Sequence, residues 1–228
     1  PVMTGFSDPE AALAALQQKD YDNDYNLGPS QTNFDIKSPD LTATGQTTTE
    51  SSSFGAIFTP TSITYDVTAK DTTGTFQDTS FPMPISYTAK AIAFNLLMPT
   101  AKTDEPTPFN LDISLDALAI NDMLWGMFDP TAQLPRDPLT LDLDVDGTAK
   151  PAFSLLDPNS MIASMMAGEQ SELNSLSLIT RFFAGLGAEL KGSGEFTFDN
   201  ADLQSFGGFP RPIGSATLTA SGVNGLMD

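Results

Sequence analysis

The chain has 228 residues, 40% of them hydrophobic, with a formal net charge of −19 and neither Cys nor His. Without Cys, the sequence excludes disulfides, thiolate nucleophiles and Cys-based metal sites. Without His, it lacks the usual general base and the usual transition-metal ligand, so we expect no cofactor, no metal and no classical enzyme. The negative charge repels phosphate backbones, which argues against nucleic acid as a partner.

The first third of the chain predicts one helix, a loop and several polar strands. A Ser-Asp-Pro-Glu start at residues 7–10 predicts a helix over residues 7–18. The polar segment 19–30 ends in Gly-Pro and is predicted to be a loop. Residues 42–53 are rich in Thr and Ser, as in an exposed strand pair or its turn, and residues 71–74 predict a turn.

Alternation of apolar and polar residues predicts most of the remaining strands. In residues 109–116, Phe, Leu and Ile alternate with Asn, Asp and Ser, as expected when one strand face is buried and the other meets water. The same pattern marks 63–68, 139–146 and 188–199, with a turn predicted at Asp146-Gly147, and residues 215–221 are predicted to form the last strand. Short helices are predicted at 122–128 and 157–168.

These elements predict a single β-rich domain over residues 1–228. No regular alternation of strands with helices is present, which argues against a parallel sheet. The fold class is therefore expected to be mainly β, with a curved antiparallel meander sheet and two or three short helices covering its apolar face. No segment has the length and apolar content of a transmembrane span.

One apolar cluster is a candidate ligand site. It consists of Met123, Trp125, Met127 and Phe128. Methionine-rich surfaces adapt to apolar ligands or partners, so the cluster is either such a surface or a plug over one end of the sheet. The same two interpretations apply to Met161, Met165 and Met166.

A second candidate is a calcium loop, of which the sequence matches only the opening residues. Asp142, Asp144 and Asp146-Gly147 match the opening of an EF-hand loop. The loop needs an acidic residue at its twelfth position, where this chain has Phe153. We therefore interpret the aspartates as the solvated face of a strand.

Carboxylate pairs are the remaining route to catalysis. Asp112 with Asp116, or Glu189 with Glu195, have the residue types that glycoside hydrolysis uses. On alternating strands, however, all four are expected to face water. Arg136 lies between Pro135 and Asp137 and is expected to form a structural ion pair. The glycines at positions 185, 187, 192 and 194 are expected to serve turns and sheet curvature.

Several stretches resemble the DUF2125 family of alphaproteobacterial envelope proteins. They are DMLWGMFDP at 122–130, LPRDP at 134–138, GAELKGSGEFTFDNADL at 187–203, FGGFP at 206–210 and GLMD at 225–228. The resemblance implies a longer precursor with a secretory signal, further β structure before Pro1, a tail after Asp228 and a periplasmic location. The family has no known function, so it assigns no site residues.

Three functions remain open on these residues. The first is non-enzymatic binding of a lipid or other apolar ligand in the concave face of the sheet, which fits its many inward Leu, Phe and Met positions. The alternative is a structural or assembly component of the envelope that pairs with a protein partner through an edge-like strand at 42–53. A hydrolase that uses carboxylates alone is the third. In architecture only, the pattern is similar to envelope proteins whose long curved sheets handle lipids or outer-membrane assembly.

Overall fold

A computed structural model describes residues 20–38, 42–79, 83–132, 136–184 and 188–222 of the chain. Strands account for 67% of the described residues, so the predicted fold class is confirmed. The helix predicted at residues 7–18 lies outside the described residues.

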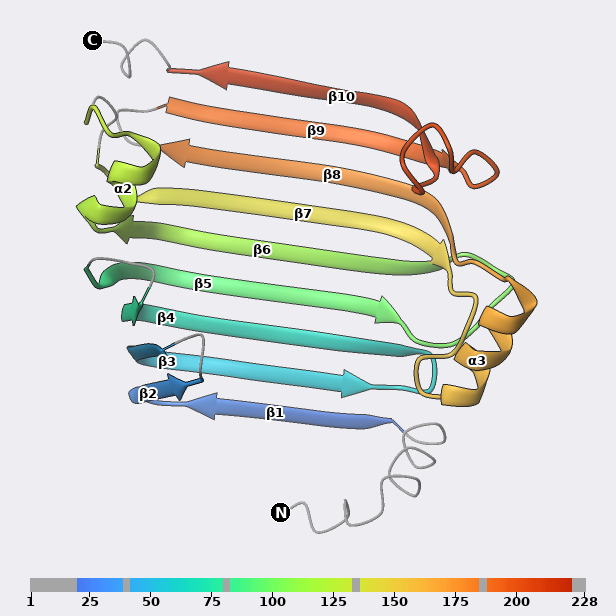
Figure 1. Ribbon diagram of the computed structural model, residues 1–228, viewed down its shortest axis with the longest axis horizontal. Coiled ribbons are helices and arrows are strands. Elements are labelled where there is room, and N and C mark those ends of the chain that lie inside the picture. The colour runs from blue at the N-terminus through green and yellow to red at the C-terminus, as the bar shows by residue number, and fades with distance from the viewer. Residues whose placement is uncertain (1–19, 39–41, 80–82, 133–135, 185–187, 223–228) are drawn as a thin grey trace.

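Within the described residues, ten strands form one sheet, and two short helices lie in the connections between strands (Figure 1). The strands are β1 (Tyr21–Leu27), β2 (Ser30–Lys37), β3 (Thr42–Phe58), β4 (Ser62–Asp78), β5 (Ile85–Pro99), β6 (Thr107–Ile120), β7 (Leu139–Lys150), β8 (Glu172–Ala184), β9 (Ala188–Asp199) and β10 (Arg211–Ser221). The helices are α2 (Asp122–Phe128), between β6 and β7, and α3 (Pro158–Ala167), between β7 and β8.

The sheet is an antiparallel meander that curves without closing. From β3 to β10, each strand pairs with the next one in sequence. β1 and β2 both pair with β3, one beyond the other, and so form one interrupted edge. β10 forms the opposite edge (Figure 1). The helices lie near opposite ends of the strands, with α2 at the end where β6 finishes and α3 at the other.

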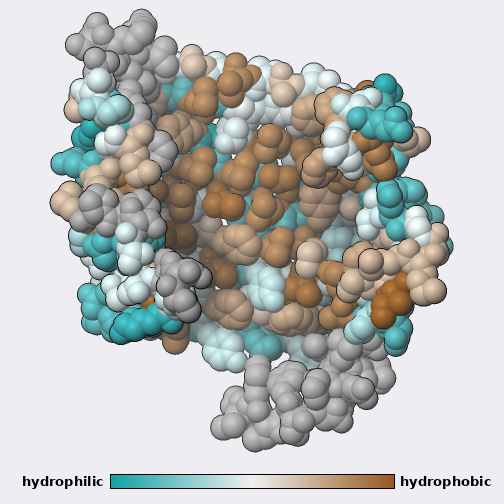
Figure 2. Space-filling view, viewed as in Figure 1, coloured by the Kyte–Doolittle hydropathy of each residue, from teal (hydrophilic) through white to brown (hydrophobic). Residues whose placement is uncertain are grey.

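Strand register brings the apolar positions onto one face. Directly opposed residues in an antiparallel pair point to the same side, and so do alternate residues along a strand. The register therefore aligns Phe94 with Ile113 and Leu143, and Leu96 with Leu111 and Val145. Figure 2 shows the result, a hollowed face with hydrophobic side chains across its middle. The polar residues between them occupy the other face.

Several sequence-based predictions fail where strands run longer than expected. The predicted loop at 19–30 contains β1, because its backbone pairs with β3 despite a polar composition. The predicted turn at 71–74 lies inside β4, where Asp71 has a left-handed φ of 47° and the strand continues. Pairing with a neighbouring strand satisfies the backbone in both places, and local sequence does not report that pairing.

The Thr/Ser-rich segment is not an edge. β3 pairs with β1 and β2 on one side and with β4 on the other. Its hydroxyls bond across the β3–β4 pair, as in Ser53 with Thr68 at 2.6 Å and Thr48 with Thr73 at 2.8 Å. The exposed edge inferred for residues 42–53 is therefore wrong.

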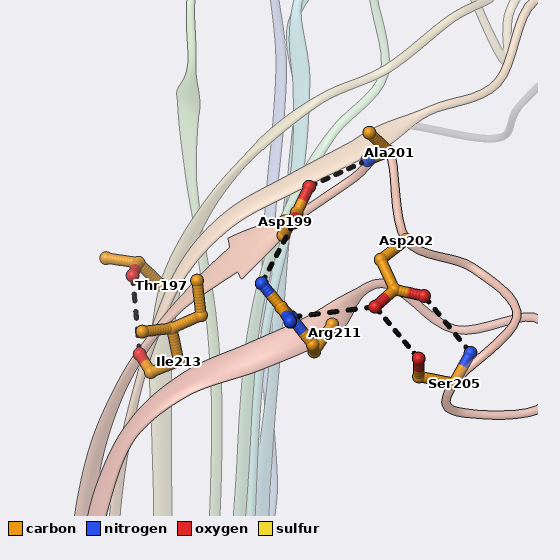
Figure 3. Close-up of polar contacts among 7 residues, drawn as sticks. All are labelled: Thr197, Asp199, Ala201, Asp202, Ser205, Arg211 and Ile213. Carbon is orange, nitrogen blue, oxygen red and sulfur yellow. Dashed lines mark hydrogen bonds and ion pairs between the residues drawn. The ribbon is translucent and has the colours of Figure 1, made fainter.

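Polar side-chain contacts join the end of β9, the β9–β10 connection and the start of the edge strand β10 (Figure 3). Arg211 reaches Asp199 at 3.2 Å and Asp202 at 3.6 Å. Ser205 donates its hydroxyl and its backbone N–H to Asp202, and these hydrogen bonds lower the pKa of that carboxyl. The contacts lock the β9–β10 connection and hold the register of the last strand.

Gly147 occupies a strand position with no room for a side chain. A turn is predicted there, but β7 continues to Lys150 and Phe109 lies directly opposite Gly147. A Cβ at position 147 would sit 2.2 Å from the Phe109 ring and 2.4 Å from the Ser175 carbonyl oxygen. The glycine thus lets the aromatic ring cover the neighbouring backbone, a pairing that stabilises glycine in sheets.

We predict that Gly147→Ala lowers the free energy of unfolding by about 1–3 kcal/mol, because overpacking displaces the Phe109 ring or the Ser175 backbone. Gly126 in α2 is the matched control, since no atom lies within 4 Å of its added Cβ. Gly126→Ala should stabilise the protein by up to about 1 kcal/mol through helix propensity. Urea unfolding of both variants measures the difference, and equal stability would contradict the packing argument.

Candidate functional site

The candidate site is the middle of the apolar face, which we call the trough. Its floor consists of Val67 (β4), Phe94 and Leu96 (β5), Leu111 and Ile113 (β6), Leu143 and Val145 (β7) and Leu178 (β8). These residues form two rows that run across the strands. The trough therefore lies perpendicular to the strand direction, between the end that carries α2 and the end that carries α3 (Figures 1 and 2).

The side chains of the described residues do not fill the trough. Among the described residues, the fully buried hydrophobic ones are five alanines and Trp125. No Leu, Ile, Val, Phe or Met in that part of the chain reaches full burial. Globular domains normally bury these residue types most completely, so the described part of the chain lacks a sealed core. The alanines are Ala43, Ala56, Ala89, Ala152 and Ala188.

A hollow of about 440 Å³ lies where the trough meets the approach to α3. Leu96, Leu111 and Val145 form its floor, and Phe153 and Leu155 line it from the segment that leads into α3. The backbone N–H of Leu155 donates to the Thr100 carbonyl at 2.7 Å, which fixes this segment against the end of β5. The volume lies in the range of small-molecule sites, and the lining is almost entirely apolar.

The four predicted ligand-binding residues take different positions around α2. Trp125 is buried, Met123 is partly buried and Met127 is exposed. The side chain of Phe128 lies outside the described residues. The cap of this helix forms as predicted, because the Asn121 side chain accepts a hydrogen bond from the N–H of Leu124.

The ring of Trp125 packs against the guanidinium of an ion pair. The guanidinium of Arg136 stacks on its ring at 4.9 Å and bonds the buried carboxylate of Asp129 at 2.8 Å. This arrangement matches the structural role expected for Arg136. Trp125 therefore contributes to a rigid end wall, which agrees with the plug interpretation for this one residue.

The other face of the sheet is acidic. Asp112 of β6 lies directly opposite Asp144 of β7. Asp142 and Asp146 flank Asp144 along β7. A hollow of about 320 Å³ on this face is lined by Asp112, Asp142 and Asp144 together with Arg181. Desolvation, the hydrogen bond with Asp146 and repulsion from Asp146 and Asp112 raise the pKa of Asp144.

The carboxylates singled out in the sequence lie apart along their strands, as Asp116 does, four residues beyond Asp112 on β6 and opposite Ala91 of β5. No group of three acidic side chains in the described part of the chain is placed to hold a metal ion. Glu189 is bonded by Arg181 at 2.6 Å and by Lys191 at 2.9 Å, and these cations lower its pKa. Glu195 lies six residues further along the same strand, opposite Ser177.

Sequence reasoning missed the residues that border the trough near α3. Phe153 and Leu155 lie outside any strand or helix, so no periodicity marks them as lining residues. The one available signal is composition: two large apolar residues sit in a coil segment just before a helix cap at Asp157.

Comparison with protein-family models, curated proteins and solved structures finds no match to this chain. Within the described residues, neither helix has the length or the apolar content needed to cross a membrane.

We predict that Arg136→Gln destabilises the protein by about 1–3 kcal/mol, because the Asp129 carboxylate then stays buried without its charged partner. The near-UV circular dichroism of the lone tryptophan should change in the same variant, since the stacked cation is lost. Asp129→Asn in the Arg136→Gln background should recover part of the loss. An unchanged unfolding midpoint in the single variant would refute the structural role of this pair.

The acidic face predicts a pH dependence of stability. A raised pKa in the folded state means that stability falls as pH rises from 3.8, the ordinary value of Asp144, through the raised value. Asp144→Asn should therefore stabilise the protein at pH 7 by about 0.5 kcal/mol and have no effect below pH 3.8. Glu189→Gln is the control and should change stability in the opposite direction: it should destabilise the protein at pH 7, because the pKa of Glu189 is lowered in the folded state. Thermal melts of both variants and the wild type across this pH range measure the direction of each change in stability.

Proposed function

We propose that this chain is a non-enzymatic binding protein whose trough holds the acyl chain of a lipid or another elongated apolar ligand. The observation that carries the proposal is the absence, among the described residues, of any fully buried large aliphatic side chain. Apolar area left in water is unfavourable by roughly 25 cal/mol per Å², so a surface of this kind gains free energy when a ligand covers it.

The shape of the trough favours a long ligand over a compact one. Its floor crosses five adjacent strands, from Val67 on β4 to Leu178 on β8. Neighbouring strands lie about 4.8 Å apart, so the floor extends for about 19 Å. In the two floor rows, the central strands β5 to β7 contribute only apolar side chains, whereas Tyr65 on β4 and Thr180 on β8 add a hydroxyl group at either end. A hydrocarbon chain lying across the strands fits this surface.

The cellular setting that we propose is the periplasm, on the resemblance of the chain to the DUF2125 family. A surface charge of −19 suits a protein that must stay soluble while it exposes an apolar face. It also disfavours anionic headgroups near the binding face. We therefore propose neutral or zwitterionic lipids as the ligand class.

A structural role in envelope assembly is the alternative, and one observation favours it. β10 is an edge strand, and its residues from Pro212 to Ser221 carry no charge, so its outer backbone is open to pairing with a strand of a partner protein. The former reason for this alternative, an edge at residues 42–53, no longer applies.

The test of lipid binding is titration of the delipidated full chain with a pyrene-labelled fatty alcohol, which carries no charge. We predict that Ile113→Asp weakens binding at least about tenfold, because a carboxylate in the trough floor would lose its hydration under the ligand. Leu111→Trp should also weaken binding, since the larger ring occupies the hollow without adding charge. Circular dichroism verifies that each variant remains folded.

Ile179→Asp is the matched control for this experiment. Ile179 lies opposite Asp144 on the acidic face and is 55% exposed. The same substitution there should leave the affinity unchanged. An equal loss of affinity in Ile113→Asp and Ile179→Asp, or no saturable binding by the wild-type chain, would contradict the proposal.

A further inference from the structure

Helix α3 presents its apolar side chains outward and its hydroxyls inward. Ser164 is the one fully buried residue of the helix, at 2% exposure, and Ser160 accepts a hydrogen bond from the backbone N–H of Ser154. Ile162, Met165 and Met166 are 57%, 74% and 85% exposed. A surface helix of a soluble protein shows the reverse arrangement, with its apolar stripe toward the core.

The exposed residues form one continuous stripe. Ile162, Met165 and Met166 are spaced three and four residues apart, so they lie on the same side of the helix. Figure 2 shows hydrophobic side chains over α3 at the margin of the hollowed face. Methionine and isoleucine offer no hydrogen-bond donor, so this stripe has no polar group with which to recognise a partner.

No residue from Pro158 to Ala167 is charged, in a chain with 29 acidic and 10 basic residues. The nearest acids are engaged at the helix ends. Asp157 caps the first turn by accepting from the N–H of Asn159, and Glu169 pairs with Lys102. The outward side of α3 is therefore a neutral apolar strip on a strongly acidic protein.

The strip adjoins the trough. Phe153 and Leu155, which line the 440 Å³ hollow, directly precede the helix cap at Asp157. Leu155 is itself partly in water, so apolar surface continues from the hollow toward the exposed side of the helix. An apolar molecule that leaves the trough at this end meets α3 first.

We propose that α3 docks the protein onto the surface of a zwitterionic lipid bilayer. A ten-residue helix is too short to span a membrane, but an apolar stripe of this kind inserts into the boundary between headgroups and acyl chains. Basic residues, which usually add attraction to anionic lipids, are absent from the helix, and the net charge of −19 repels such lipids. The docking is therefore driven by apolar burial alone and is weak and reversible.

The same helix supplies the link to ligand exchange. With α3 in the boundary layer, the hollow beside Phe153 and Leu155 would face the acyl chains of the membrane. This step rests on the proposed function, whereas docking rests on α3 alone.

Co-flotation of the full chain with phosphatidylcholine vesicles tests the proposal. We predict that the wild-type chain floats with these vesicles and that the double variant Met165→Asp, Met166→Asp reduces the floated fraction at least tenfold. Both residues are exposed and should be replaceable without unfolding the protein, which a thermal melt verifies. Flotation should be insensitive to salt with pure phosphatidylcholine and should fall when phosphatidylserine is added.

Met83→Asp is the matched control, because Met83 is 56% exposed and precedes β5, at the strand end opposite α3. This variant should float like the wild type. No flotation of the wild-type chain, equal flotation of the double variant, or equal loss with Met83→Asp would overturn the proposal. Binding of a partner protein through α3, without vesicle binding, would also overturn it.

A vesicle-free titration separates this proposal from the proposed function. The double variant should bind the pyrene-labelled fatty alcohol as the wild type does, because the trough floor is untouched. Flotation that depends on α3, without any binding of the fatty alcohol, would leave docking intact and remove the proposed ligand. Binding of the fatty alcohol without flotation would leave the proposed function intact and overturn docking.

Discussion

The structure depends on a constraint of single-layer sheets: one face is apolar, and its contact with water is unfavourable until something covers it. In this chain, strand register gathers leucine, isoleucine, valine and phenylalanine onto one side of the meander. The two described helices cover only the strand ends (Figure 1). Within the described residues, the middle of that face is left uncovered, and the proposed binding function rests on this observation.

Local signals were sufficient to predict the helices and much of the sheet. Asn121 and Asp157 cap α2 and α3, and Gly168 ends α3 in a left-handed conformation, so short-range chemistry defines both elements. β9 begins and ends as predicted because its alternation is regular. Non-local pairing decided the rest. β1 is polar and is a strand only because β3 lies beside it, and Gly147 stays in β7 because the Phe109 ring needs its missing side chain.

The apolar face of the sheet was predictable from the sequence, but the position of the trough on it was not. Inward Leu and Phe positions indicated an apolar binding face, yet the sequence drew attention to α2, where Trp125 is held by Arg136. The trough arises from the alignment of five strands, and its lining near α3 includes coil residues without periodicity. Methionines of α3 were visible in the sequence, but their outward orientation depends on Ser164 being the buried side, which only packing reveals.

The central claim is that the trough is occupied by an apolar molecule in the cell. The most direct measurement is native mass spectrometry of the full-length protein isolated from its own cells under mild conditions, followed by solvent extraction. We predict that the protein carries an added mass, which extraction releases as a neutral or zwitterionic lipid. The Ile113→Asp variant should lack this added mass. A protein that carries no apolar molecule, and whose mass is unchanged after incubation with lipid, would contradict it.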